Sequence, residues 1–364
     1  MSQIDRINKL FNQGLNLFNQ KQFDQARQNF TQVIALQPQH FNALHALGVI
    51  AGLQHQHELA QSFFEKCLKI NSDHIPSIFN YANSLFESAQ YANAEKFYQQ
   101  AFQLKPNDAK ICLNYGNCLF KLNKNEQAID IYAKSIQINP EQYEPFLNIG
   151  IIKSNEKKYE EAIINLKKCS NLNPNIKNCR NLLGFCFMKI HDYTKAIQEF
   201  EKAIQLDEKY MEAYINLAMA YREAKEYPKA ISVYQKALQI TEDQKLLETI
   251  YTDLSNICLE INDNNFNKDY SQAIEYAKKA ETINSKNTTV LQNIGIGNLF
   301  MGNFIVSQQY FEKAYDINPN DKYLIKSLAT CFSHLGRYDR SEQLLKRLEL
   351  LFPGDKIIFS SSHL

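Results

Sequence analysis

The segments Ile138-Asn139-Pro140 and Leu172-Asn173-Pro174 each close an amphipathic stretch, and their prolines lie 34 residues apart. Pro106 precedes Pro140 by the same spacing, and Pro38 precedes Pro106 by twice that spacing. A fixed period of this length indicates a repeat architecture, in which one supersecondary unit recurs. Continuing the count divides the sequence between an N-terminal extension (1–6) and a C-terminal tail (356–364) into ten units: 7–40, 41–74, 75–108, 109–142, 143–176, 177–210, 211–244, 248–287, 288–321 and 322–355.

Each unit contains two amphipathic segments, which we predict to be helices A and B. The twentieth position of the unit is alanine in eight units and serine in the other two. The eighth position is also small throughout, namely Gly14, Gly48, Ala82, Gly116, Gly150, Gly184, Ala218, Ser255, Gly295 and Ala329. A large side chain usually occupies position 24, as in Phe30, Phe64, Tyr98, Tyr132, Phe200, Tyr234 and Phe311. Small residues let two helix backbones approach, and we expect the large side chain to fill the space beside them.

This pattern resembles the tetratricopeptide repeat, a helix–turn–helix unit, over residues 7–355. The resemblance implies an all-α fold, a right-handed α-solenoid of about ten units whose concave groove is lined mainly by A helices. Because no single unit can bury its apolar face, stability has to come from stacking neighbours, which predicts one elongated domain. Two residues are unusual for core positions, Arg180 and Lys153. Unit eight is longer than the others, with extra residues at 245–247 and a predicted surface loop at 262–269.

The composition argues against several classes of partner. With 40 basic and 39 acidic side chains, the chain lacks the charge excess of a dedicated nucleic-acid or anionic-membrane binder. No apolar run is long enough for a transmembrane helix, and the polar N-terminus does not resemble a signal peptide. Eight cysteines without a CxxC pair favour free thiols in a reducing compartment. We therefore expect a cytoplasmic protein with no nucleic-acid or membrane partner.

The sequence contains none of the common catalytic signatures: no Walker loop, no HExxH and no G-x-S-x-G elbow. Gly295-Ile296-Gly297 lies inside a predicted A helix, where packing explains it better than nucleotide binding. The histidines are interpreted as surface or groove residues, and the cysteines as small core hydrophobes. We therefore predict a protein that is not an enzyme and that binds no metal or cofactor.

One polar pattern remains. Position six of helix A is asparagine in six units, although asparagine is only 37 of 364 residues and is poorly suited to helix interiors. These residues are Asn12, Asn80, Asn114, Asn148, Asn216 and Asn293, and Asn83, Asn117 and Asn256 follow at position nine of their units. A carboxamide offers one acceptor and two donors, so a column of them could pair with an extended peptide backbone. The alternative is that these amides bridge adjacent helices or hold water.

The column is similar to the asparagine ladder in the repeat region of O-linked N-acetylglucosamine transferase and its bacterial relatives. That resemblance implies that position-six asparagines hold the backbone of a protein ligand. Ala46, Leu182, Asp253 and Ser327 interrupt the column, so its longest uninterrupted run is Asn80, Asn114 and Asn148. The best candidates for peptide binding are these three, followed by Asn12, Asn216, Asn293, Asn83 and Asn117.

Three functions are consistent with this sequence. The first is a non-enzymatic scaffold that binds an extended polypeptide segment in its concave groove. The second is the substrate-recognition region of a protein-modifying transferase whose catalytic domain is absent from this chain. The third is a structural assembly subunit that binds through its convex face. The last unit ends in apolar residues without a polar capping helix, which predicts self-association or continuation of the chain at that end.

Overall fold

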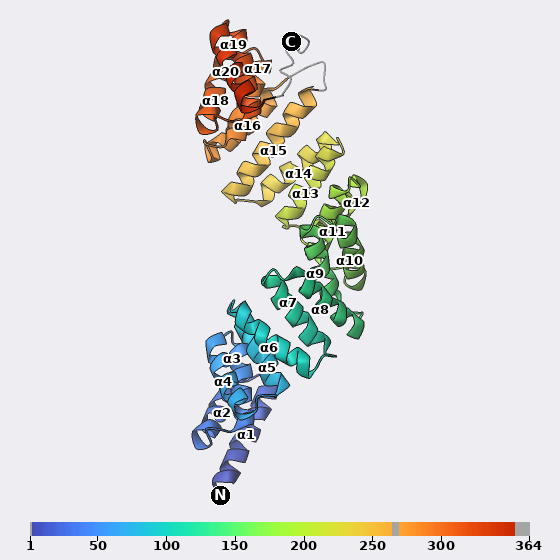
Figure 1. Ribbon diagram of the computed structural model, residues 1–364, viewed down its shortest axis with the longest axis vertical. Coiled ribbons are helices and arrows are strands. Elements are labelled where there is room, and N and C mark those ends of the chain that lie inside the picture. Colours follow the sequence, from blue (N-terminus) through green and yellow to red (C-terminus); the bar gives the residue numbers. More distant parts are fainter. Residues whose placement is uncertain (1, 264–268, 354–364) are drawn as a thin grey trace. The chain divides into compact units, whose positions relative to one another are not determined.

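The computed structural model describes residues 2–263 and 269–353, and this part of the chain contains twenty α-helices and no strand (Figure 1). The helices are α1 (Gln3–Asn19), α2 (Phe23–Leu36), α3 (Phe41–Leu53), α4 (His57–Ile70), α5 (Ile75–Glu87), α6 (Tyr91–Leu104), α7 (Ala109–Lys121), α8 (Asn125–Ile138), α9 (Tyr143–Asn155), α10 (Tyr159–Leu172), α11 (Lys177–Lys189), α12 (Tyr193–Leu206), α13 (Met211–Glu223), α14 (Tyr227–Ile240), α15 (Gln244–Asp263), α16 (Ser271–Ile283), α17 (Thr288–Phe300), α18 (Phe304–Ile317), α19 (Lys322–His334) and α20 (Tyr338–Leu351).

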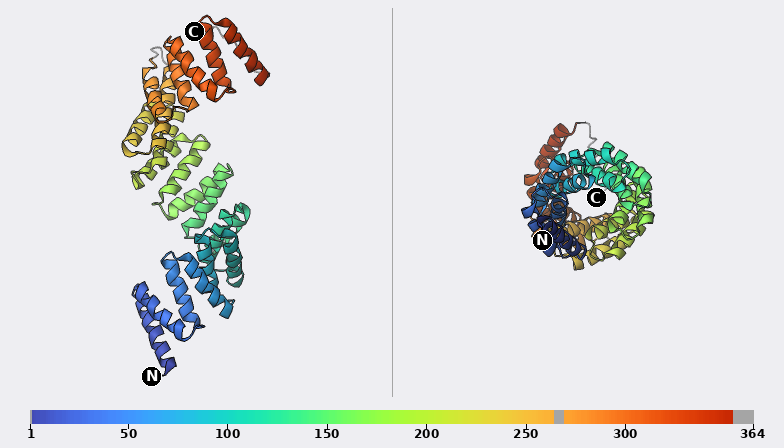
Figure 2. Two further views of the ribbon diagram at one scale, coloured as in Figure 1. Left: turned by 90° about the vertical axis from the view of Figure 1, so that its left-hand side faces the viewer. Right: turned by 90° about the horizontal axis from the view of Figure 1, so that it is seen from below.

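From α1 to α10, and again from α12 to α20, each helix packs on the next one along the chain, and the helices form helix–turn–helix hairpins (Figures 1 and 2). The main contacts join helices that are adjacent, or next but one, in the sequence. The predicted all-α solenoid of helix–turn–helix units is therefore confirmed. The contacts also divide the chain into two compact units, Met1–Cys179 and Arg180–Leu364, with the boundary inside α11. Each unit is described by itself below.

The core of each hairpin follows the predicted pattern of small and large residues. In the hairpin of α7 and α8, a Cβ added at Gly116 would lie 2.5 Å from Cε1 of Tyr132. Tyr132 and Ala128, at positions 24 and 20 of the same repeat, are both fully buried. A larger residue at Gly116 would have to displace the tyrosine ring, because protein cores are close-packed. This explains why the eighth position is small.

The turns inside nine hairpins, all within the described residues, share a feature that the repeat pattern does not mark. Position 15 adopts a left-handed backbone with φ between 57° and 78° in nine repeats, at Lys21, His55, Ala89, Asn123, Lys157, His191, Lys225, Gly302 and Gly336. Only two of these nine are glycine, the residue that adopts this conformation without steric cost. Contacts within the hairpin therefore hold seven side-chain-bearing residues in a conformation they do not favour.

The structure differs from the sequence-based boundaries in two places. Helix α1 begins at Gln3, inside the predicted N-terminal extension, because Ser2 and Asp5 form a reciprocal capping box. Helix α15 begins at Gln244, so residues 245–247 lengthen this helix and are not a separate insertion. The Asp243 carboxylate caps it by accepting from the backbone N–H groups of Lys245 and Leu246 at 2.8 and 3.1 Å.

The first two residues of the predicted loop at 262–269 belong to α15, which ends at Asp263. Residues 264–268 of that loop lie outside the described residues, as does the tail at 356–364.

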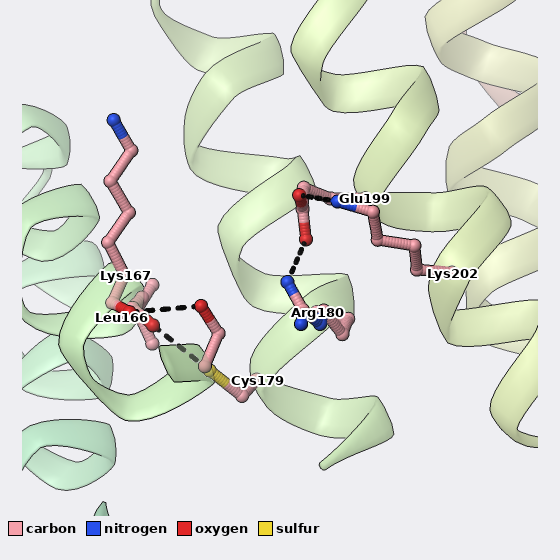
Figure 3. A network of polar contacts seen from close by, with 7 residues as sticks. Leu166, Lys167, Cys179, Arg180, Glu199 and Lys202 are labelled. Atoms are coloured by element: carbon pink, nitrogen blue, oxygen red, sulfur yellow. Dashed lines mark hydrogen bonds and ion pairs between the residues drawn. The ribbon is translucent and has the colours of Figure 1, made fainter. Parts of the chain in front are cut away.

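The two charged residues at core positions are neutralised by ion pairs. In Figure 3, Nη1 of Arg180 on α11 lies 2.9 Å from Oε2 of Glu199 on α12, and Oε1 of Glu199 lies 2.7 Å from Nζ of Lys202. Glu199 is only 8% exposed, so these two cations offset the cost of burying its charge. Lys153 on α9 lies 2.9 Å from Glu161 on α10. Arg180 and Lys153 thus each form an ion pair between the A helix and the B helix of their own hairpin.

Candidate functional site

In the first compact unit (Met1–Cys179), five asparagines of the predicted ladder lie on three consecutive A helices and are partly exposed. Asn80 and Asn83 are on α5, Asn114 and Asn117 on α7, and Asn148 on α9. The structure joins them across the repeats. Nδ2 of Asn114 donates to Oδ1 of Asn83 at 3.0 Å, and Nδ2 of Asn148 donates to Oδ1 of Asn117 at 2.8 Å. Position six of one repeat is therefore bonded to position nine of the repeat before it.

Two buried tyrosines on B helices complete these networks. The hydroxyl of Tyr98 on α6 donates to Oδ1 of Asn83 at 2.7 Å, and that of Tyr132 on α8 donates to Oδ1 of Asn117 at 2.7 Å. Burial raises the pKa of both phenols well above the usual value, so each remains a hydrogen-bond donor. Each position-nine oxygen thus accepts two bonds, which determines which end of its amide faces the neighbouring repeat.

This arrangement leaves acceptor groups available on the position-six side chains. Asn114 and Asn148 each use Nδ2 for the inter-repeat bond, and Oδ1 of either residue makes no hydrogen bond with any described residue. A second N–H of the Asn114 amide is also left over, because a primary amide has two, whereas the Asn148 amide also interacts with the Tyr132 hydroxyl. The role as a bridge between helices and a role in ligand binding are therefore compatible for these two residues.

The sequence analysis did not identify Tyr98 and Tyr132 as partners of the ladder, although the residues at positions nine and 24 indicate this pairing. Position 24 is tyrosine in two of the three repeats that have asparagine at position nine, with the pairs Tyr98 and Asn83, and Tyr132 and Asn117. It is phenylalanine in four repeats where position nine is apolar, namely Phe30, Phe64, Phe200 and Phe311. Tyr234 is an exception, because position nine of its repeat is Met219 and its hydroxyl donates to the Asp253 carboxylate. All three tyrosine hydroxyls have an acceptor, because a buried hydroxyl without a partner is costly.

Asn80 and Asn12 are in a different situation from the bridged residues. The repeat before Asn80 has Val49 at position nine, and the Asn80 carboxamide makes no hydrogen bond with any described residue. Asn12 lies on α1, in the first repeat, and is exposed. Both side chains keep all their donors and acceptors for solvent or a ligand.

In the second compact unit (Arg180–Leu364) the ladder is less regular. Nδ2 of Asn216 on α13 donates at 3.0 Å to Oδ1 of Asn181, a residue at position five that the sequence pattern did not single out. Asn293 on α17 donates to Asn256 at 2.7 Å and to Ser255 at 3.3 Å, and it is only 5% exposed. Asn293 is the only position-six asparagine of the described residues that is buried, and its assignment to peptide binding stays a prediction.

Asp253 on α15 occupies position six of the eighth repeat (248–287), where other repeats have asparagine. Its Oδ2 accepts from the hydroxyl of Tyr234 at 2.8 Å, and burial raises the pKa of this carboxyl group. The guanidinium of Arg222 acts in the opposite direction by stabilising the carboxylate. A carboxylate can only accept hydrogen bonds, so the ladder is also chemically interrupted here.

Two histidines cap helices, and the cysteines lie in the core. His40 and His74 are the N-caps of α3 and α5, and Nδ1 of each accepts a backbone N–H from the first turn. All eight cysteines are buried, and burial raises the pKa of the Cys67 and Cys258 thiols to about 11.

Within residues 2–263 and 269–353, no three His, Cys, Asp or Glu residues are grouped so as to hold a metal ion. No helix in this part of the chain is both long and apolar enough to span a membrane.

Comparison with known families agrees with this geometry. Models of the tetratricopeptide repeat match residues 8–40, 41–74, 85–147, 143–176 and 174–243, which together are more than half of the sequence. The chain contains tetratricopeptide repeats. No curated protein matches it at the level of sequence.

Solved structures of tetratricopeptide-repeat proteins are similar to this chain in fold. The C-terminal part of a repeat-containing protein from Cytophaga hutchinsonii is 19% identical, covers 69% of this chain and 99% of its own, and has a TM-score of 0.59. Pseudomonas aeruginosa pilF is 17% identical over 58% of this chain and 92% of its own, with a TM-score of 0.49. YrrB, described as a TPR protein with an unusual peptide-binding site, is 23% identical over 50% of this chain and 94% of its own, with a TM-score of 0.45.

Proposed function

We propose that this chain is a non-enzymatic interaction scaffold that binds an extended polypeptide segment along its A helices. The observation that supports this proposal is the set of carboxamides on α5, α7 and α9. Asn80, Asn114 and Asn148 recur at one position of three consecutive repeats, and each has an acceptor oxygen that no described residue uses. An extended backbone presents N–H and C=O groups at regular intervals, which such a column can pair with.

Preorganisation strengthens the case for Asn114 and Asn148. Their amides are held by Asn83 and Asn117, which are themselves held by buried tyrosines. A ligand therefore does not have to order these two side chains when it binds, and this reduces the entropic cost of association. Asn12 and Asn216 are secondary candidates, and the burial of Asn293 argues against direct contact with a ligand.

The test compares two kinds of asparagine. Peptides are selected on the wild-type protein from a random-peptide display library, and their affinities are measured by fluorescence anisotropy. The triple variant Asn80→Ala, Asn114→Ala, Asn148→Ala should bind them about tenfold or more weakly, because each lost hydrogen bond is worth about 1 kcal/mol. Asn80→Ala alone should also weaken binding and should leave stability unchanged, since this side chain holds no other residue.

Asn293→Ala is the matched control. This residue makes two inter-repeat hydrogen bonds from a buried position, so its loss should lower stability without changing peptide affinity. Unchanged binding by the triple variant, with circular dichroism showing that it is folded, would refute the proposal and assign the ladder to inter-repeat packing alone.

A further inference from the structure

A pocket of about 190 Å³ opens between α3 and α5 in the first unit, next to Asn80. Gly52 and Leu53 of α3 form one wall, Asn80 and Glu87 of α5 form the other, and His57 and Phe64 of α4 also line it. A Cβ added at Gly52 would meet no atom within 4 Å, so the pocket is open directly at this residue. Leu53 beside it is 54% exposed.

The neighbouring repeats indicate what this space would hold. Position 12, where Gly52 lies, is Phe18 in the first repeat and Phe86 in the third. The Phe86 ring packs edge-on against Tyr91 at 5.2 Å and against Tyr98 at 6.5 Å between ring centroids. The Phe18 ring packs edge-on against Phe23 at 5.6 Å.

The second repeat retains the partners of this ring but lacks the ring itself. His57 and Phe64 occupy the positions that correspond to Tyr91 and Tyr98, and both line the pocket. Gly52 therefore leaves vacant the place that a phenylalanine fills on either side. An apolar cavity of roughly 150 Å³ is known to admit benzene, so this pocket is large enough for an aromatic side chain.

We propose that this pocket binds an aromatic side chain of the extended polypeptide held by the ladder. This inference rests on the proposed function and adds the chemistry of one ligand residue. The inserted ring would pack on Phe64 and His57 as Phe86 packs on Tyr98 and Tyr91. The unpaired carboxamide of Asn80 lies at the same pocket and holds the ligand backbone beside that residue. Aromatic pairs prefer this edge-on arrangement.

The test uses Gly52→Phe, which supplies from the protein itself the ring that the neighbouring repeats already have. Peptides selected from the random-peptide library on the wild type should share one aromatic position. Changing that residue to alanine should weaken binding to the wild type by about tenfold to a hundredfold, because a large apolar side chain is no longer buried. The same change should have little effect on binding to Gly52→Phe, because the pocket is already filled.

Gly52→Ala is the second variant, chosen because it adds the least volume to the helix. It should fold and should reduce the contribution of the aromatic residue only in part. Circular dichroism and thermal melting of both variants establish that they are folded before affinities are compared. An aromatic residue that contributes equally on wild type and Gly52→Phe would overturn the proposal, and so would selected peptides without a shared aromatic position.

The outcomes separate this inference from the proposed function. Peptides that depend on Asn80, Asn114 and Asn148 but not on Gly52 would leave the scaffold function intact and refute the aromatic pocket. Peptides that depend on neither would refute both. If sedimentation without peptide shows a dimer that Gly52→Phe converts to a monomer, the pocket binds a second copy of this chain, and the proposal is wrong.

Discussion

At the scale of single residues, the structure assigns roles by hydrogen-bond capacity. Asn83 and Asn117 each accept two bonds through one oxygen, and the donors are a buried tyrosine and the asparagine of the next repeat. A buried phenol costs stability unless it finds an acceptor, so the tyrosine and the asparagine depend on each other. This dependence explains why the carboxamides of Asn83 and Asn117, and those of Asn114 and Asn148 that bond to them, have defined orientations.

The same reasoning applies to a half-buried pair of histidines. Nδ1 of His45 on α3 and Nδ1 of His74 both lie 2.9 Å from Oγ of Ser77, which is fully buried. Nδ1 of His74 also accepts the backbone N–H of Ser77, so this nitrogen carries no proton. Burial lowers the pKa of His45 to about 4, with a further contribution from His74, and burial also lowers the pKa of His74. The other titratable group at this serine is the Cys67 thiol.

This cluster predicts a loss of stability in mild acid. An unfolded histidine has a pKa of about 6.5, whereas folded His45 has a pKa of about 4. Between these values the unfolded state binds more protons, so the free energy of unfolding should fall as the pH drops from 6.5 towards 4. His45→Gln, which cannot titrate, should make this dependence shallower in urea titrations at a series of pH values. His55→Gln, at an exposed turn, is the control, and an unchanged slope in His45→Gln would contradict the prediction.

At the scale of the helix hairpin, the turn stores conformational strain. Ala89 joins α5 to α6 with φ of 59°, a conformation that costs a residue with a Cβ about 1 kcal/mol relative to glycine. Gly302 and Gly336 occupy the same position in the last two described hairpins with φ of 78° and 70°. The hairpins therefore tolerate either residue, and the geometry is imposed by the packing of the two helices.

Ala89→Gly should therefore stabilise the protein. We expect a gain of about 1 kcal/mol, reduced somewhat by the greater freedom of glycine in the unfolded chain. The midpoint of urea unfolding, followed by circular dichroism, measures the change. Ala133→Gly, at an exposed position inside α8, should instead lose up to about 1 kcal/mol, because glycine is a poor helix former. A loss of stability in both variants would show that the turn is not strained.

At the scale of the whole chain, the stability of each repeat depends on its packing against adjacent repeats. The main contacts join helices that are adjacent or next but one in the sequence. Stability is then close to a sum of repeat terms and nearest-neighbour interfaces, and disruption of one repeat affects those beside it most. A single two-state unfolding transition is therefore not expected for this chain.

Hydrogen exchange can test this locality. In Gly116→Val, the added side chain would collide with Tyr132 in the core of the α7–α8 hairpin, at a cost of about 1–3 kcal/mol. Exchange should increase in α7 and α8 and, to a smaller degree, in α5, α6, α9 and α10. Protection in α17–α20 should remain as in the wild type. A uniform increase along the chain would show that the repeats unfold together.

The sequence alone determined the repeat length, the pairing of helices and the pattern of small and large core residues. These features are local or periodic: a proline beyond the first turn ends a helix, and a small residue recurs where two helices of a hairpin approach. The positions of the ladder asparagines followed from the same periodicity. The left-handed turn position was not apparent, because only Gly302 and Gly336 mark it in the sequence.

Tertiary structure decided what each ladder residue can do. Asn80, Asn114 and Asn293 share one position in the repeat, yet one has no partner, one is bridged with an oxygen to spare, and one is buried. The difference arises from residues 31 to 38 positions away in the chain, whose contacts depend on how two repeats stack. The vacancy at Gly52 is of the same kind, because a missing side chain becomes a pocket only when the surrounding helices keep their places.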